Sequence, residues 1–195
     1  DEAALGLVFA SGALRELTGA ERAGHLRYKP GTGLTAALFD AVGAPVGWLR
    51  VVADGADKLA NARRRAGRRG LAVESAALSE HCVAFWGPIL TDPGLAKAFD
   101  DVDASLATSW RILRYNPLRR LVVRATDAGG AVVAGRLTTD PQDQLREAHD
   151  RIARQVPTVA RVRPTIPRSA RITWWDWCDG GDLAALASNR PEAAA

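Results

Sequence analysis

The sequence predicts an α+β protein made of two tandem similar units, each an antiparallel sheet with a packed helix. The first observation is an internal repeat: residues 26–51 align with residues 113–138 without a gap, and ten of the 26 pairs are identical. Self-similarity of this kind usually means two copies of one structural unit. The second observation is that each copy contains short apolar runs separated by turn residues and followed by a segment with helical spacing.

The repeat extends past these strands. After a one-residue shift, residues 57–68 align with residues 143–154, and residues 82–98 then correspond to residues 172–187. Each copy is therefore expected to run through a meander of strands, a helix and two further strands. This order places one helix after the third strand of each sheet.

The two copies are expected to meet in a polar segment. Residues 100–109 read DDVDASLATS and precede Trp110, where the second copy begins. Domain boundaries usually fall in such polar stretches. We therefore place a first domain at residues 1–105 and a second at residues 106–195.

In the second copy, the turn sequence DAGG at 127–130 separates two apolar runs and predicts a hairpin. Asp140 is expected to cap the following helix, with Pro141 at its first position. Val156–Pro157 should end that helix. The remaining expected elements are two strands, at residues 159–164 and 170–177, and a closing helix that begins at residue 180.

Composition indicates a globular protein of the cytoplasm. The chain is 47% hydrophobic, and it contains no apolar run of the roughly 20 residues that a membrane span needs. No signal peptide is readable at its start. Cys82 and Cys178 have no Cys or His neighbours typical of a zinc site, so we expect a reducing compartment and no metal held by cysteine.

Much of the net charge of +4 lies in RRRAGRRG, residues 63–70. Such a patch could attract phosphates or nucleic acid. The alternative is the solvated end of a helix, where arginines complement the helix dipole and Gly67 and Gly70 end the helix. We favour the helix end, because no RNA-binding signature accompanies the arginines. A nucleic-acid partner is therefore not expected.

The second copy carries a pair of charges suited to a phosphate. Alternation places Ala134 and Arg136 on one face of a strand, and Glu147 lies on the next helix. A cation on a strand can bind a phosphate and is held in place by a helix carboxylate. The alternative is an ordinary surface ion pair of little energetic value. Arg119 and Arg120, in the preceding turn, are either further phosphate contacts or solvated turn residues.

These residues resemble the Val-Ala-x-Lys motif and helix glutamate of kinases, as in small-molecule kinases of the aminoglycoside phosphotransferase family. Residues 114–120 resemble that family's phosphate-facing hairpin, residues 146–159 its N-lobe helix and next strand, and residues 174–184 its hinge into the C-lobe. The resemblance implies that Arg136 takes the place of the lysine. It also implies that backbone groups near Asp176 and Trp177 meet an adenine.

The first copy is expected to keep the architecture without this chemistry. In the alignment, Leu49 stands at the position of Arg136 and Asn61 at that of Glu147. The first domain resembles the cap domain that precedes the N-lobe in bacterial maltokinases and related sugar kinases.

The resemblance implies the N-terminal, nucleotide-binding portion of an ATP-dependent phosphotransferase. Its partners would be ATP, a small-molecule acceptor such as a sugar or aminoglycoside, and the C-lobe. ATP and magnesium are expected to bind only with the C-lobe present, because the catalytic His-x-Asp segment and the metal-binding carboxylates have no match in this sequence. No catalytic or metal-binding residue is therefore assigned.

Three histidines, His25, His81 and His149, lie apart from one another and from any obvious nucleophile. We interpret them as surface or structural residues. The alternative to the kinase reading is a non-catalytic, duplicated scaffold module that binds a protein partner through the tryptophan-rich end, residues 174–177. Those tryptophans fit either a nucleotide site or a core and lobe interface.

Overall fold

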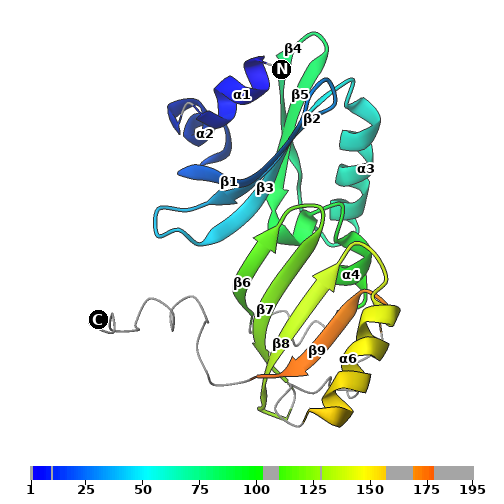
Figure 1. Cartoon of the computed structure of the whole chain (residues 1–195). Helices are drawn as coiled ribbons and strands as arrows, with labels where there is room; N and C mark the ends of the chain where they lie inside the picture. The colour runs from blue at the N-terminus through cyan, green and yellow to red at the C-terminus, as the bar shows by residue number, and fades with distance from the viewer. Residues whose placement is uncertain (1, 10, 103–109, 128, 157–168, 178–195) are drawn as a thin grey trace, which may run out of the picture.

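The computed structural model describes residues 2–9, 11–102, 110–127, 129–156 and 169–177. It contains two antiparallel sheets, of five and four strands, with helices packed against them (Figure 1). This confirms the predicted α+β class with two sheet units. The predicted strand at 159–164 and the closing helix from residue 180 lie outside the described residues.

The first unit contains a five-stranded sheet in the order β1-β2-β3-β5-β4. Its elements are α1 (Glu2–Phe9), α2 (Ser11–Thr18), β1 (Arg22–Lys29), β2 (Gly33–Phe39), β3 (Pro45–Ala53), α3 (Ala56–Gly67), β4 (Glu74–Ser79), β5 (Cys82–Pro88) and the short 3₁₀ helix η1 (Ile89–Thr91).

The second unit contains a four-stranded sheet in the order β6-β7-β8-β9. Its elements are β6 (Arg111–Asn116), β7 (Arg120–Thr126), β8 (Val132–Thr138), α6 (Asp143–Gln155) and β9 (Ile172–Asp176), and the short helix α4 (Ala96–Asp100) precedes them in the chain. Strands β6-β7-β8-β9 repeat the antiparallel order β1-β2-β3-β5, and α6 follows the third strand as α3 does. The expected equivalence of the two halves is thus confirmed at the level of strand order.

The hairpin turns of the two units are built alike. Asp40 Oδ1 accepts hydrogen bonds from the backbone N–H of Val42 and of Ala44, at 3.1 and 2.8 Å. Asp127 Oδ1 accepts the equivalent pair from Gly129 and Ala131, at 3.0 and 2.8 Å. The aligned Gly43 and Gly130 both have φ of 81°, a backbone conformation that glycine adopts without strain. The identical Asp and Gly residues of the repeat therefore form the same turn in both units.

The two hairpins differ by one β-bulge, and this corrects the alignment. In the first sheet the register between β2 and β3 shifts between Leu38 and Phe39. Beyond the bulge Thr35 pairs with Arg50, just as its counterpart Val122 pairs with Arg136. Arg50, and not Leu49, therefore occupies the position of Arg136. The ungapped alignment chose the wrong residue because a bulge adds a residue inside a strand without changing the turn.

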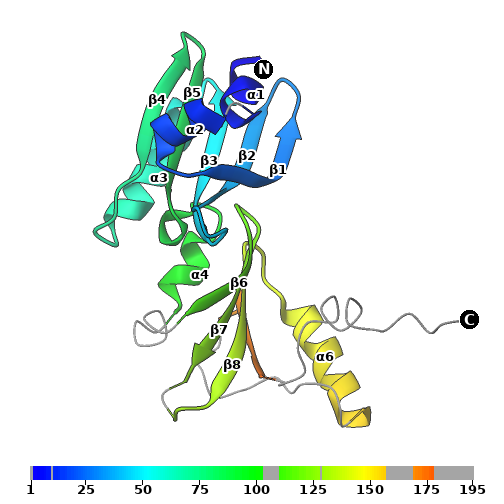
Figure 2. The same cartoon turned by 90° about the vertical axis from the view of Figure 1, so that its left-hand side faces the viewer.

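Helices cover the first sheet on both faces: α1 and α2 lie on one side and α3 on the other in Figure 1, and Figure 2 shows the sheet with α1 and α2 in front of it. Leu14 of α2 packs in one hydrophobic cluster with Leu49 and Val51 of β3. On the other face, Ala62 and Ala66 of α3 pack in a second cluster. Trp48 and Val52 of β3 belong to this second cluster. Because side chains alternate along a strand, Arg50, between them, lies on the same α3 face.

One hydrophobic cluster joins the two units. It contains Trp48 and Phe85 of the first sheet, Leu95 and Phe99 around α4, and Leu137 of the second sheet, among other buried residues. Burial of a large apolar side chain contributes about 2 kcal/mol, so such a shared core resists separation of the two sheets. The units therefore pack against each other through a common core, with α4 and the segment before it at their junction.

Helix α6 starts later than the sequence predicted. It begins at Asp143 with Gln142 as its N-cap residue, so Asp140 and Pro141 belong to the preceding loop and the predicted cap is wrong. The loop is held by other hydrogen bonds: Thr138 Oγ1 donates to the Asp140 carbonyl at 2.8 Å, and the Gln142 N–H donates to Ala170 O at 2.7 Å. Bonds to Thr138 at the end of β8 and to Ala170 in the turn before β9 outweigh the local capping preference.

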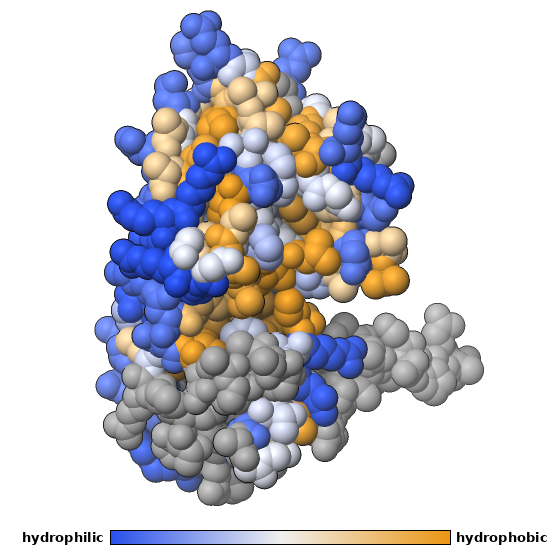
Figure 3. Space-filling model, turned by 180° about the vertical axis from the view of Figure 1, so that it is seen from behind, coloured by the Kyte–Doolittle hydropathy of each residue, from blue (hydrophilic) through white to orange (hydrophobic). Residues whose placement is uncertain are grey.

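The arginine-rich segment is the end of a helix, as interpreted. Helix α3 ends at Gly67, and Gly70 has φ of 67°. Three arginines bind neighbouring segments: Arg63 donates to Val73 O at 3.2 Å, Arg65 to Pro93 O at 2.6 Å, and Arg69 to Ala96 O and Asp100. Hydrophilic side chains gather at the edge of the molecule that α3 forms (Figure 3).

No helix in the described part of the chain is long and apolar enough to cross a membrane.

Candidate anion-binding site

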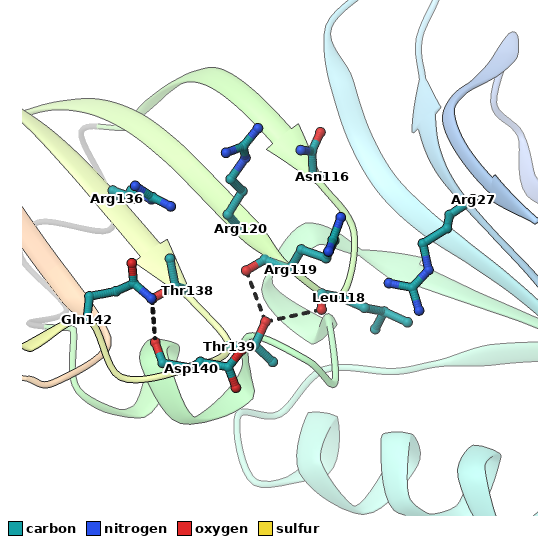
Figure 4. Close-up of a pocket in the computed structure, with 10 residues that line it drawn as sticks. All are labelled: Arg27, Asn116, Leu118, Arg119, Arg120, Arg136, Thr138, Thr139, Asp140 and Gln142. Atoms are coloured by element: carbon teal, nitrogen blue, oxygen red, sulfur yellow. Dashed lines mark hydrogen bonds between the residues drawn. The ribbon is translucent and has the colours of Figure 1, made fainter. Parts of the chain in front are cut away.

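A pocket of about 470 Å³ lies where the first unit meets the β6–β7 turn of the second. Figure 4 shows its lining, in which guanidinium groups from three different segments approach one another. The lining residues are Arg27, Asn116, Leu118, Arg119, Arg120, Arg136, Thr138, Thr139, Asp140 and Gln142. We call this the arginine pocket.

The arginine pocket is strongly positive. It is lined by four arginines against one carboxylate, that of Asp140. None of the ion pairs within 4.0 Å in the described residues involves any of these four arginines. Partial burial and the nearby charges of Arg114, Arg136 and Arg119 lower the pKa of Arg120. Crowded cations of this kind repel one another, and an anion bound among them would relieve that repulsion.

The turn that carries Arg119 and Arg120 is held by backbone hydrogen bonds. Leu118 has φ of 59°, which is uncommon for a residue other than glycine. Thr139 Oγ1 donates to one of the carbonyls of Leu118 and Arg119, at 3.2 and 3.0 Å, and the Thr139 N–H donates to Arg119 O at 3.1 Å. The turn is therefore anchored to the end of β8.

Asn116 orients the Arg120 side chain. With its amide oxygen toward Arg120, Asn116 accepts hydrogen bonds from Arg120 Nε and Nη2 at 3.1 and 3.2 Å. A planar guanidinium held on one edge keeps its other N–H groups available for a ligand. Asn116 thus fixes a cation at the wall of the pocket.

A buried carboxylate, that of Asp92, stabilises the same turn through hydrogen bonds. Asp92 is fully buried and accepts hydrogen bonds of 2.8 Å from Tyr115 Oη, the Leu118 N–H and the Gly94 N–H. Burial raises the pKa of the Asp92 carboxyl, although these hydrogen bonds act in the opposite direction. Burial, together with the Asp92 charge, also raises the pKa of Tyr115. Asp92 therefore links the segment before α4 to the start of the second sheet.

Arg136 lies on β8 and faces the arginine pocket. Its neighbours on the strand, Gly135 and Leu137, are buried on the opposite face. The Arg136 Nε atom is buried and has no hydrogen-bond partner within the described structure. An unsatisfied N–H of a charged group is costly, so a ligand oxygen that accepts this bond would be stabilising.

The predicted ion pair between Arg136 and Glu147 is wrong. Glu147 is exposed, and no salt bridge joins it to Arg136 among the described residues. Helix α6 instead directs Arg146 and His149 toward the sheet: Arg146 donates to Ser169 O at 3.2 Å, and the His149 ring lies 5.9 Å from that of Trp175. The helix is rotated by about one residue from the orientation that the kinase pattern implied.

The expected adenine-binding segment lies at the other end of β8. Asp176 pairs with Val133, and the Trp177 N–H donates to Val132 O at 3.4 Å, whereas Thr138 is at the pocket end of the same strand. The Arg124 guanidinium lies 5.3 Å from the centre of the Trp177 ring.

Of the six residues assigned from the sequence, the arginine pocket contains Arg119, Arg120 and Arg136. Glu147, Asp176 and Trp177 do not line it. The tryptophans of β9 lie on opposite faces of the sheet: Trp174 is 3% exposed and pairs with Gly135, whereas Trp175 lies on the α6 side.

Several residues of the pocket were not predicted from the sequence: Arg27 of the first unit, Asn116, Thr138, Thr139 and Gln142. A signal for Arg27 was present, since the repeat aligns it with Arg114 in the arginine-containing hairpin of the second copy. Its position beside the second unit depends on how the units pack, which the sequence pattern does not contain.

Metal ligands do not cluster in the described residues: no group of three or more His, Cys, Asp or Glu side chains is placed to hold an ion. Comparison of the chain with protein-family models, curated proteins and solved structures gives no match. The assignment of the arginine pocket therefore depends on its own geometry and charge.

Proposed function

We propose that the second unit binds the phosphates of a nucleotide in the arginine pocket, as the nucleotide-binding portion of an ATP-dependent phosphotransferase. The observation that carries this proposal is the convergence of Arg119, Arg120 and Arg136 on one pocket without a carboxylate partner. Guanidinium groups bind phosphate oxygens through paired, charge-assisted hydrogen bonds.

The layout of the second sheet supports a nucleotide rather than an isolated phosphate. The phosphate-binding arginines lie toward one end of β8, and the tryptophan-rich end of β9 lies at the other. Trp175 and Arg136 lie on one face of the sheet, because Arg136 pairs with Thr173 and Trp175 is two residues further along β9. Indole rings stack on bases, so a base at the tryptophan-rich end and phosphates at Arg136 would bind toward opposite ends of one sheet.

In this proposal, the phosphoryl acceptor is a hydroxyl of a small molecule such as a sugar or aminoglycoside. Orienting that hydroxyl and holding magnesium require carboxylates, which the resemblance assigns to a C-lobe. The residues of this chain would bind and orient the nucleotide. ATP and magnesium would bind well only with the C-lobe, because a nucleotide held on one side makes about half of its contacts.

Removing Arg136 is expected to weaken nucleotide binding. In a longer chain that includes the C-lobe, Arg136→Ala should reduce the affinity for ATP and magnesium at least tenfold, since a charge-assisted bond to phosphate contributes about 1.5 to 3 kcal/mol. Calorimetric titration measures this affinity. Arg151→Ala, on the exposed side of α6, is the matched control and should leave it unchanged. Equal affinities of wild type and Arg136→Ala would contradict the proposal.

A non-catalytic scaffold remains the second candidate, and one observation favours it. Leu145 and Ile152 are 46% and 51% exposed and lie on one face of α6, as their spacing requires, and Val156, directly after the helix, is 42% exposed. Such a face can bind a partner protein. The two candidates differ in one result: a scaffold predicts no ATP binding by the longer chain.

A further inference from the structure

We infer that the first unit contributes Arg27 to the phosphate site, so that a polyphosphate chain binds across the junction and contacts both units. This inference rests on the proposed function and adds a residue, and a unit, to the site. It assigns a binding role to the domain that the sequence alignment treated as lacking the phosphate-binding chemistry.

Arg27 extends from β1 toward the Leu118–Arg119 turn, as Figure 4 shows. It lines the same pocket as the three arginines of the second unit. Arg27 is exposed and is not part of any ion pair within the described ranges. Its guanidinium is therefore available to an anion that enters the pocket.

The position of Arg27 follows from the duplication. Arg27 pairs with Thr35, and Thr35 pairs on its other side with Arg50. The second sheet repeats this row, where Val122 lies between Arg114 and Arg136. Each unit thus places one arginine on each side of an uncharged residue. The first copy retains this arrangement through the bulge that brings Arg50 into register.

The two arginines of the first unit lie close enough to affect each other. Burial, and then the charge of Arg27, lower the pKa of Arg50, whereas the charge of Asp92 raises it. Asp92 lies at the junction, and its charge also acts on Arg50. The first unit therefore adds to the positive potential at the pocket, which an anion would reduce.

The packing at the junction holds Arg27 and Arg119 in a fixed relation. A side chain on Gly94 would place its Cβ 2.6 Å from the Leu118 Cα, so the segment after Asp92 packs directly against the turn. The shared hydrophobic cluster and the Asp92 hydrogen bonds add to this contact. A site built from both units is thus preorganised, which lowers the entropic cost of binding.

The charge of the pocket specifies the class of ligand. Four guanidinium groups and one carboxylate match an anion with several negative charges, such as a diphosphate or triphosphate chain. A single phosphate can occupy only part of such a lining. Inorganic tripolyphosphate carries the phosphate chain without a base and is therefore the appropriate probe.

The test is a titration of the 195-residue chain with tripolyphosphate at low ionic strength, followed by NMR. Arg27→Ala should weaken binding about fivefold to tenfold. Lys29→Ala is the matched control, because Lys29 lies two residues along the same strand, is exposed and does not line the pocket. It should weaken binding less than twofold.

The outcomes separate this inference from the proposed function. Equal weakening by Arg27→Ala and Lys29→Ala would overturn the inference and leave the proposed function in place, provided that Arg136→Ala abolishes binding. No tripolyphosphate binding by the wild-type chain would overturn the inference and leave the proposed function to the titration of the longer chain. Binding that Arg136→Ala leaves unchanged would overturn both.

Discussion

Asp92→Ala is expected to lower the free energy of unfolding by about 4 kcal/mol, one of the largest effects of any single substitution in this chain. The carboxylate accepts hydrogen bonds from Tyr115, Leu118 and Gly94 in a fully buried site. Its removal leaves these donors without an acceptor, and each unsatisfied buried donor costs about 1 to 3 kcal/mol. The turn that carries the pocket arginines loses its support at the same time.

Denaturant unfolding of wild type, Asp92→Ala and Tyr115→Phe measures this effect. Tyr115→Phe removes a single donor and should cost about 1 kcal/mol, because the two backbone donors keep their acceptor. A loss of less than about 1 kcal/mol in Asp92→Ala would show that the carboxylate does not hold the junction together.

The same residue gives a pH dependence of defined sign. Burial raises the pKa of Asp92 above its ordinary value of 3.8, so the folded protein binds this proton more tightly than the unfolded chain. The resulting stabilisation is complete below the unfolded pKa and is lost as pH rises through the folded pKa. The free energy of unfolding of wild type minus that of Asp92→Asn should therefore become more positive as pH falls toward 4, because asparagine does not titrate. A difference that becomes more negative as pH falls would mean that the folded pKa is lowered.

Gly135→Val is expected to destabilise the second unit by about 3 kcal/mol or more. A Cβ on Gly135 would lie 2.3 Å from the Trp174 ring, which is 3% exposed and cannot move away without disturbing the core. Valine otherwise favours a strand, so strand propensity alone predicts the opposite sign. Thermal unfolding of the two proteins decides between these expectations.

Gly12→Ala is the control for glycine replacement in general. No atom lies within 4 Å of a Cβ built on Gly12, which is on helix α2. Alanine there should stabilise the protein by about 0.5 to 1 kcal/mol. If Gly135→Val were as stable as wild type, Trp174 would not pack on the strand as described.

The sequence contained enough to predict the two-unit plan because the repeat preserves turn chemistry. Asp40 and Asp127 each close a hairpin with two backbone hydrogen bonds, and the glycines that follow adopt the same φ. These interactions are local, so residue type and spacing identify them.

Features that depend on packing between elements were not predictable in this way. The bulge at Leu38 changes which residue of β3 pairs with Thr35, although it alters no motif. The start of α6 at Asp143 depends on bonds to Ala170, far away in the sequence. The rotation of α6, which exposes Glu147 and turns Arg146 inward, depends on contacts with the sheet.

For the candidate site, the sequence identified the three arginines that belong to one hairpin and its neighbouring strand. Arg27 and Asp92 were missed because they reach the site only when the first unit packs on the second. A buried acidic residue in a loop has no sequence signature. Asp92 becomes recognisable only through its burial and its three donors.

The most direct test of the central claim, that a polyphosphate binds in the arginine pocket, is NMR of the arginine Nε–H groups during titration of the chain with tripolyphosphate. We expect the largest shift changes at Arg27, Arg119, Arg120 and Arg136, all of which line the pocket. Changes that are largest at Arg63, Arg64 and Arg68, on or next to α3, would instead show general attraction to the basic end of that helix and would contradict the claim.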